Sequence, residues 1–336
     1  MKEEIFNIQS ESQFLDISLE IFKHQFKHNN VYRSFCDLLF VHPSEVESIK
    51  EIPFLPIQFF KSHKIISSLD EVQETFTSSG TTGSTTSKHF ITDCSLYEES
   101  YLKGFAHFYG DIETYVVLAL LPNYLERKGS SLVYMVDDLI QKTKHSESGF
   151  YLNNVSELAQ KLKQLDASGQ KVLLIGVSFA LLDLVEEQQF NLKNTVIMET
   201  GGMKGRRKEL IRSELHQILS TGFGVNHIHS EYGMTELLSQ GYSKGRGVFD
   251  CPPWMKILTR DTEDALTIQE PGKAGGINVI DLANYNSCSF IATQDLGRSY
   301  SNGSFEVIGR FDNSDIRGCN LRVLSFFNSF IDYMQN

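Results

Sequence analysis

The sequence is poor in cysteine, in positive charge and in long apolar runs, and each shortage disfavours a class of protein. Its five dispersed cysteines form no Cys-x-x-Cys pair, which disfavours a zinc site and predicts reduced thiols. With 31 basic against 42 acidic residues, the chain lacks the basic character of a general nucleic-acid binder. No run approaches the roughly eighteen apolar residues of a membrane span, and no apolar signal region follows the charged start. We therefore expect a cytoplasmic protein with no membrane span and no nucleic-acid partner.

The pattern of apolar residues predicts an α/β fold. The 336 residues, 41% apolar and 22% charged, suit one large or two ordinary globular domains. Residues 12–40 repeat apolar side chains at helical spacing, and from about 70 to 240 strand-like and helix-like segments alternate. That alternation predicts a doubly wound, mostly parallel sheet with flanking helices. Short strands and turns after about 245 indicate a smaller β-rich lobe. We expect a large domain over 1–317, with a helical start over 1–50, and a short tail over 318–336.

A loop of small, hydroxyl-bearing residues runs from Thr77 to Lys88, between expected strands at 72–76 and 88–91. Gly80 and Gly83 let its backbone approach a ligand closely. Amide N–H groups, hydroxyls and the Lys88 ammonium together suit a polyphosphate. The alternative is a flexible polar linker, because clusters of serine, threonine and glycine are usually loops. Strands at both ends favour the phosphate-binding interpretation.

This loop does not fit the P-loop pattern of kinases and GTPases. That pattern needs Gly-Lys followed by Ser or Thr and then a helix. Here the next helix signal is a capping box formed by Ser95 and Glu98, well beyond the loop. An ordinary P-loop enzyme is therefore disfavoured.

Two further segments are expected at the ends of strands. Gly201 and Gly202 come after an expected strand and would let a flat ring lie against the backbone; the alternative is a tight strand-to-helix turn. The segment 227–236 also follows an expected strand. It contains Glu236, which would suit Mg²⁺ together with substrate phosphates, and Tyr232, which could stack on a base. His227 and His229 are spaced for a metal, but nothing nearby completes a ligand set.

Two charged segments are expected to follow the late strands, at 293–298 and 309–312. Asp295 could accept both hydroxyls of a ribose, and Arg310 could face phosphate or ribose. Each signal is weak alone, since Asp-x-Gly is a common turn. Their order behind the loop and Glu236 gives them weight.

This ordered series resembles the adenylate-forming (acyl-activating) superfamily, in which a Thr/Ser/Gly-rich loop ending in Lys precedes a Tyr-Gly-x-Thr-Glu element. It is more similar to the LuxE-type acyl-protein synthetases, relatives of phenylacetate–CoA ligase. The similarity spans roughly residues 10 to 321 and is carried by residues 53–57, 59–61, 76–88, 231–240 and 309–321.

The resemblance implies an enzyme that joins a fatty or aryl acid to ATP, with Mg²⁺, and gives an acyl-adenylate and pyrophosphate. It implies a large domain of the adenylate-forming type and a role for each motif residue. The implied contacts are Thr77, Ser78, Ser79, Gly80, Thr81, Thr82, Gly83 and Lys88 with the β- and γ-phosphates, Thr235 with the α-phosphate, Glu236 with magnesium, Gly201, Gly202 and Tyr232 with adenine, Asp295 with the ribose, and Arg310 with ribose and phosphate.

The sequence departs from the superfamily at its C-terminal end. Eighteen residues follow Gly318, none of them lysine, where full-length members carry a mobile domain with a catalytic lysine. Cys319 is a candidate acyl-accepting nucleophile; its alternative is a small buried residue beside the hinge.

The acyl acceptor is left open among three thiols: a cysteine of the chain itself, a carrier protein or coenzyme A. A LuxE-like enzyme would pass its acyl group to a partner reductase or transferase. Two rival interpretations also stay open, an acyl–CoA ligase and a non-catalytic nucleotide-binding subunit of an acyl-transfer complex.

Overall fold

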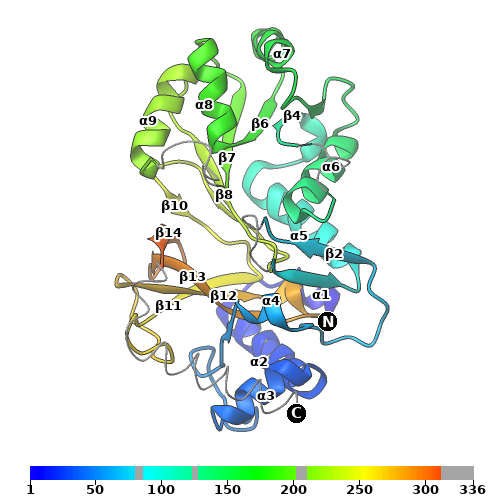
Figure 1. Ribbon diagram of the computed structural model, residues 1–336, viewed down its shortest axis with the longest axis vertical. Helices are drawn as coiled ribbons and strands as arrows, with labels where there is room; N and C mark the ends of the chain where they lie inside the picture. Colours follow the sequence, from blue (N-terminus) through cyan, green and yellow to red (C-terminus); the bar gives the residue numbers. More distant parts are fainter. Residues whose placement is uncertain (80–85, 123–127, 202–209, 312–336) are drawn as a thin grey trace.

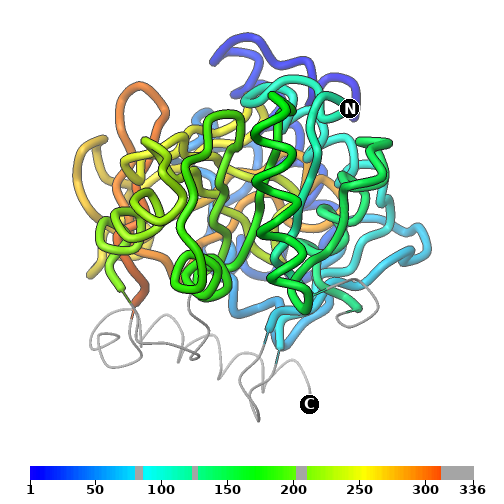
Figure 2. Tube along the Cα trace, turned by 90° about the horizontal axis from the view of Figure 1, so that it is seen from above, coloured from blue at the N-terminus to red at the C-terminus, as the bar shows by residue number. Residues whose placement is uncertain are grey.

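The computed structural model describes residues 1–79, 86–122, 128–201 and 210–311. Within these residues two six-stranded sheets occupy opposite halves of the molecule, and a two-stranded hairpin lies near the waist between them (Figure 1). Seen from above, the green half of the molecule lies in front of the half that holds the yellow and orange strands (Figure 2). Cys94, Cys251 and the buried Cys36 and Cys288 are free thiols.

The first sheet has the order β5-β4-β6-β7-β8-β9, and only the β8–β9 pair is antiparallel. Every residue of the central strands β4 and β6 is buried, as expected for a parallel sheet covered on both faces. Helices α8 and α9 lie on one side of the sheet and α6 on the other (Figure 1). The bounds are β4 Val116–Leu120, α6 Ser131–Thr143, β5 Gly149–Phe150, α7 Val155–Ala167, β6 Val172–Val177, α8 Ser178–Glu187, β7 Thr195–Thr200, α9 Arg212–Phe223, β8 His229–Tyr232 and β9 Gly241–Ser243.

The second sheet is antiparallel in the order β10-β14-β13-β12-β11, with the short β1 paired in parallel to β13. Its strands are β1 Leu55–Pro56, β10 Val248–Phe249, β11 Met255–Arg260, β12 Ala274–Asp281, β13 Phe290–Ser299 and β14 Phe305–Arg310; the 3-10 turn η2 covers Leu282–Asn284. The N-terminal helices α1 (Lys2–Ile5), α2 (Glu11–His28) and α3 (Asn30–Leu38) lie in the same half. Phe22 of α2 packs edge-on against Phe290 with ring centroids 6.1 Å apart.

The hairpin of β2 (Glu74–Thr77) and β3 (Lys88–Ile91) lies between the α4 helix (Phe59–Ser62) and the long α5 helix (Cys94–Tyr109). A short 3-10 turn, η1 (Ile112–Thr114), leads from α5 into β4. Phe76, which is fully buried, packs against Tyr97 of α5 and Tyr134 of α6. These aromatic contacts fix the hairpin to the parallel sheet.

The structure confirms the predicted fold class and the helical character of residues 12–40, and it corrects one local prediction. The stretch 12–40 forms two helices, because Asn29 ends α2 and its side chain accepts a hydrogen bond from the Tyr32 amide to cap α3. The α5 helix is capped by Asp93, so the predicted capping box at Ser95 is wrong. Glu98 instead accepts a hydrogen bond from the Tyr134 hydroxyl at 2.8 Å. Among the described residues, no helix is long and apolar enough to cross a membrane.

Candidate functional site

The motif segments meet at the end of the parallel sheet where β7 and β8 finish. β7 ends at Thr200 and β8 at Tyr232, and ligands of open α/β sheets bind beyond the carboxyl ends of such strands. The predicted segment 227–236 does not simply follow a strand: residues 229–232 are the strand β8, and Gly233 to Glu236 extend from its end.

The loop from Thr77 to Lys88, here called the predicted phosphate loop or simply the phosphate loop, has a base that is held by backbone hydrogen bonds. The strands expected on either side of the loop are β2, at 74–77, and β3, at 88–91, and they pair as a hairpin in which Thr77 lies opposite Lys88. The Thr77 amide donates to the Gly129 carbonyl oxygen at 2.7 Å, and the Ser87 amide donates to Ser78 Oγ at 2.9 Å. Gly80, Thr81, Thr82 and Gly83 lie outside the described residues. The base therefore places Thr77, Ser78 and Lys88 together and ties them to the loop that precedes α6.

A cavity of about 170 Å³ lies between this base and the end of β8. It brings together four residues predicted from the motifs: Thr77, Ser79, Gly201 and Thr235. Gly202 lies outside the described residues. Glu231 and Gln240, from the 231–240 motif, also line the cavity. The opposite wall comes from helices α5 and α6, through residues that no motif includes, among them Tyr97, Ser131 and Met135.

Glu236 is attached to the phosphate loop. Only 5% of the residue is exposed, and its carboxylate accepts a hydrogen bond from the Ser87 side chain. Burial raises the pKa of the Glu236 carboxyl; the Ser87 hydrogen bond and the charges of Arg310 and Lys61 oppose this shift. A divalent ion bound together with anionic phosphates would stabilise the ionised form of such a partly desolvated carboxylate. Within the described ranges, no cluster of three potential metal-ligating side chains forms by itself.

Tyr232, Asp295 and Arg310 form a connected chain. One oxygen of the Asp295 carboxylate accepts from the Tyr232 hydroxyl at 2.9 Å, and the other accepts from Arg310 Nε at 2.9 Å. The Tyr232 ring packs edge-on against Phe305 and Phe249. Asp295 lies inside β13, so the predictions that it follows a strand, or that Asp-x-Gly forms a turn there, are wrong. The β13–β14 pairing carries Asp295 and Arg310 on facing positions, which local turn signals could not reveal.

Two glutamates at the cavity, Glu231 in its wall and the buried Glu199, were not assigned roles from the sequence. Burial raises the pKa of Glu231 to about 7, although Thr200 Oγ1 donates to its carboxylate at 2.6 Å. Burial would also raise the pKa of Glu199, but a hydrogen bond from His216 and the charge of Arg212 outweigh it and hold that pKa below its usual value. Their environments therefore shift the pKa values of the two carboxyl groups in opposite directions.

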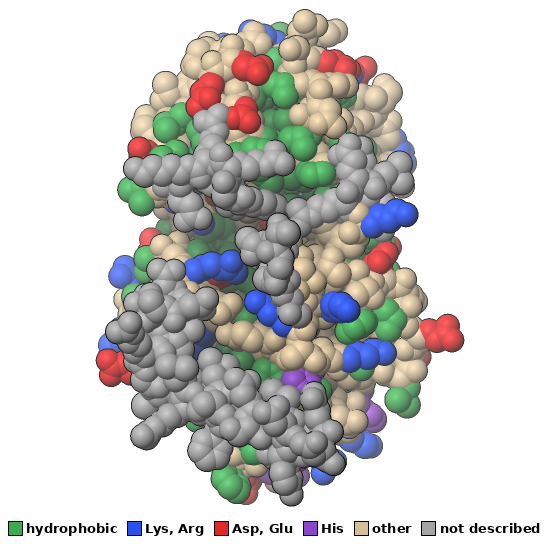
Figure 3. All heavy atoms as spheres, viewed as in Figure 1, with side chains coloured by type: hydrophobic (Ala, Val, Ile, Leu, Met, Phe, Trp, Pro, Cys, Tyr) green, Lys and Arg blue, Asp and Glu red, His purple; other side chains and the backbone are tan. Residues whose placement is uncertain are grey.

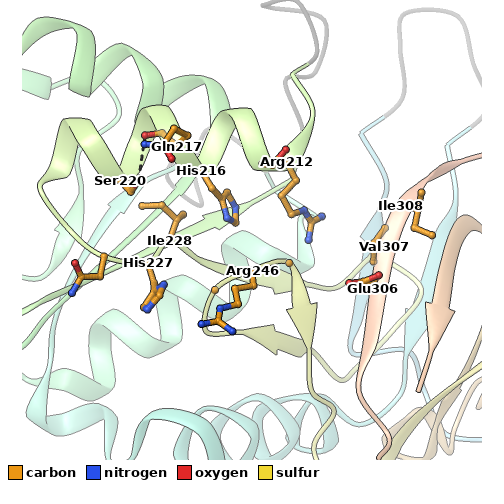
Figure 4. A pocket seen from close by; sticks show the side chains of 14 residues that line it. Arg212, His216, Gln217, Ser220, His227, Ile228, Arg246, Glu306, Val307 and Ile308 are labelled. Carbon is orange, nitrogen blue, oxygen red and sulfur yellow. Dashed lines mark hydrogen bonds between the residues drawn. The ribbon is translucent and has the colours of Figure 1, made fainter. Parts of the chain in front are cut away.

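A larger cavity, of about 400 Å³, lies between α9, the turn joining β9 to β10, and β14 (Figure 4). Arg212 and His216 line it from α9, and Val307 and Ile308 line it from β14. None of the residues predicted to bind nucleotide or magnesium lines this cavity. Of the two histidines spaced for a metal, His227 lines it, whereas His229 lies elsewhere, with its Nδ1 3.1 Å from the Tyr109 hydroxyl.

Positive side chains gather at the waist on the face shown in Figure 3. Lys61 and Lys88 are exposed, in a chain whose net charge is −11. Local concentration of positive charge can attract an anionic ligand to a protein that is acidic as a whole.

Solved structures share this fold. ATP-bound MatB from Rhodopseudomonas palustris superposes with a TM-score of 0.53 at 16% identity, covering 72% of this chain and 49% of that one. A 2-hydroxyisobutyryl-CoA ligase superposes with a TM-score of 0.66 at 11% identity, covering 90% of this chain and 70% of that one. At these identities the likeness concerns the fold. This chain spans about half the length of MatB.

The sequence comparisons point to one family within that architecture. Residues 4–93 match the family described as acyl-protein synthetase, LuxE. The long-chain-fatty-acid–luciferin-component ligase of Vibrio harveyi is 23% identical over 332 residues, 92% of this chain and 86% of that protein. The protein of the same name from Photorhabdus luminescens is 38% identical over 66 residues, 19% of this chain and 56% of that one. The predicted resemblance to LuxE-type acyl-protein synthetases is confirmed.

Proposed function

We propose that this protein activates a carboxylic acid with ATP, forming an acyl-adenylate and pyrophosphate, and transfers the acyl group to a thiol. The observation that carries the proposal is the surroundings of the buried Glu236 carboxylate, where burial raises the pKa and Ser87 of the phosphate loop and the charge of Arg310 act against that effect. The Vibrio harveyi relative, named for a long-chain fatty acid, supports a fatty acid as the substrate class.

In the first step a carboxylate oxygen attacks the α-phosphorus, and the bond from that phosphorus to the β-phosphate oxygen breaks. Both reactants are anions, so the site must offset negative charge as it moves toward pyrophosphate. Lys88 and the hydroxyl groups at the hairpin base would hold the β- and γ-phosphates. Thr235 lines the cavity where the α-phosphate would lie, and the exposed Arg310 guanidinium would offset phosphate charge from the end of β14.

The donor set fits magnesium together with nucleotide phosphates. Glu236 offers a single carboxylate of the kind that holds Mg²⁺ when phosphate oxygens complete the coordination. When bound, the ion would neutralise phosphate charge and orient the leaving group. Asp295, buried and held by Tyr232 and Arg310, presents a fixed carboxylate for ribose hydroxyls.

In the second step a thiolate attacks the acyl carbonyl carbon, and AMP leaves with the bonding electrons. The acceptor thiol is a cysteine of this chain, a carrier protein or coenzyme A. Cys319, the candidate within the chain, lies outside the described residues.

ATP–pyrophosphate exchange tests the proposal, with octanoate, tetradecanoate and benzoate as probes, each with and without coenzyme A. We expect exchange with at least one acid. Exchange that leaves labelled acyl groups on the protein, and loses that label in Cys319→Ser, would identify an acyl-enzyme. Product formation only with coenzyme A would favour the acyl–CoA ligase alternative. ATP binding without exchange for any acid would contradict the enzyme and favour a non-catalytic subunit.

A further inference from the structure

Two fully buried side chains that no motif includes contact the backbone carbonyl groups of Thr235 and Glu236. His89, the second residue of β3, places Nδ1 2.8 Å from the Thr235 carbonyl oxygen. Asn284, at the end of η2, donates from Nδ2 to the Glu236 carbonyl oxygen at 2.8 Å. Consecutive carbonyl groups of the predicted catalytic segment are thus bound by different elements of the protein.

The two supports also contact each other. His89 Nε2 lies 3.0 Å from Asn284 Oδ1. The Asn284 carbonyl oxygen accepts from Gln25 of α2 at 3.1 Å, and Phe60 of α4 packs edge-on against the imidazole. His89 therefore sits where the phosphate-loop hairpin, the Thr235–Glu236 segment and the antiparallel half of the molecule meet.

His89 adjoins Lys88 in sequence, so it couples two parts of the site directly. Lys88 is the exposed residue at the base of the phosphate loop, and His89 is the next residue, pointing into the interior. A shift of β3 would move Lys88 and the Thr235 carbonyl together. Displacements of about 1 Å at a catalytic site can cost about a hundredfold in rate.

The donors of this cluster can be assigned. Burial lowers the pKa of His89 to about 4, so the imidazole is neutral near pH 7 and carries one N–H. Both ring contacts are with acceptor oxygens, the Thr235 carbonyl and Asn284 Oδ1, because the Asn284 amide nitrogen already donates to Glu236. The single N–H can serve only one of them, and we place it on Nδ1, toward the shorter contact. Nε2 then makes no hydrogen bond to Asn284.

We infer that His89 and Asn284 are positioning residues for adenylation, which hold the Thr235–Glu236 peptide in fixed register with the phosphate loop. The inference rests on the proposed function. It adds to that function a pair of residues that contact neither substrate nor metal and act through the backbone of residues that do. The His89 Nδ1–H and the Asn284 amide each donate to a buried carbonyl oxygen, and leaving such a group without a hydrogen bond is unfavourable.

Two substitutions distinguish the roles of the two ring nitrogen atoms of His89. In His89→Asn the amide nitrogen lies near the place of Nδ1 and can still donate to Thr235, whereas in His89→Gln it lies near the place of Nε2. We expect His89→Gln to lower the exchange rate constant about a hundredfold and to raise the half-saturating magnesium concentration. His89→Asn should retain activity within about tenfold of the unmodified protein.

Asn284→Ala tests the second support independently, and the double variant tests their coupling. Asn284→Ala should reproduce the loss seen in His89→Gln. His89→Gln combined with Asn284→Ala should be little worse than the poorer single variant, since residues acting as a unit are non-additive. Additive losses would contradict a shared role.

Asp166→Asn is a matched control for burial and hydrogen bonding. Asp166 is 6% exposed and accepts from the amides of Lys193 and Asn194, next to the start of β7 and far from Thr200. The Asp166→Asn variant should have a lower melting temperature, with the magnesium dependence of exchange unchanged. If His89→Gln and Asp166→Asn behave alike once compared at equal stability, His89 is only structural and the inference is wrong.

Binding of a non-hydrolysable ATP analogue provides a measurement that does not need turnover. In the unmodified protein, added magnesium should tighten analogue binding, and His89→Gln should reduce that gain about tenfold, whereas Asp166→Asn should not. A failure of exchange in the unmodified protein would contradict the proposed function alone. An unchanged magnesium gain in both His89→Gln and Asn284→Ala would overturn the positioning role.

Discussion

Arg310 Nε donates to Asp295 Oδ1 at 2.9 Å, and this pairing crosses from the last residue of β14 to the middle of β13. Asp295 is nearly buried, whereas 74% of the Arg310 side chain is exposed. The charge of Asp295 is also the main cause that raises the pKa of Arg310. The pair therefore has a fixed acidic end inside the protein and a cationic end that reaches solvent beside Glu236.

Asp295→Ala should weaken ATP binding more than it weakens folding. It removes the acceptor for ribose hydroxyls and frees Arg310 and the Tyr232 hydroxyl. We expect the KM for ATP to rise at least about tenfold, equivalent to about 1.4 kcal/mol. Steady-state exchange kinetics measure this. Tyr232→Phe removes one hydrogen bond and keeps the carboxylate; a KM increase as large as that of Asp295→Ala would show that Asp295 acts only by supporting Tyr232.

Glu236→Gln should reduce activity without reducing stability. Because burial raises the pKa of this carboxyl, the ionised form is penalised in the protein without its ligands. A neutral amide of the same shape relieves that penalty but is a poor magnesium ligand. We expect exchange to fall about a hundredfold or more, with a melting temperature equal to or above that of the unmodified protein. Parallel losses of exchange and melting temperature would make Glu236 a structural residue.

Glu231 should make the protein less stable as the pH rises toward neutral. Its pKa is about 7 in the folded protein, against an ordinary value of 4.5 in the unfolded chain. Between these values the folded state holds a proton that the unfolded state has lost, so the free energy of unfolding falls as pH increases. Above pH 7 the cost is of the order of 1–3 kcal/mol.

Glu231→Gln should remove this pH dependence. The amide keeps an oxygen that can accept from Thr200 and cannot ionise. Urea unfolding at pH 5 and pH 8 measures the effect: the variant should be more stable than the unmodified protein at pH 8 and about equal to it at pH 5. A variant that is less stable at pH 8 would show that the ionised carboxylate is favourable in the fold.

The sequence carried enough information for the fold class and for the order of the site, because both depend on local patterns. The buried apolar runs of β4 and β6 and the hydroxyl-rich loop ending at Lys88 are visible without any contact information. The support beneath the site is different. His89 and Asn284 are 195 positions apart, and single polar residues in a strand and a turn carry no spacing signal. The same holds for Ser131 and Met135, whose helical periodicity marks them only as facing inward.

Gly129→Ala should loosen the base of the phosphate loop. Gly129 has φ 77°, a left-handed conformation that costs an alanine about 1–2 kcal/mol. An added Cβ would also lie 3.1 Å from Thr77 Oγ1 and 3.3 Å from the Thr75 carbonyl oxygen. The Gly129 carbonyl accepts the Thr77 amide, so a shift of this turn would lengthen that bond. We expect faster hydrogen exchange at the Thr77 amide and a higher KM for ATP.

Gly169→Ala separates backbone strain from contact with the loop. Gly169 has a similar φ of 81°, but an added Cβ would meet nothing within 4 Å. Both variants should lose comparable stability, since each forces alanine into a left-handed conformation. Only Gly129→Ala should also affect the Thr77 amide and ATP binding, because only Gly129 touches β2. If Gly169→Ala raised the KM for ATP as much, the effect would come from global destabilisation and the hairpin base would not be set by Gly129.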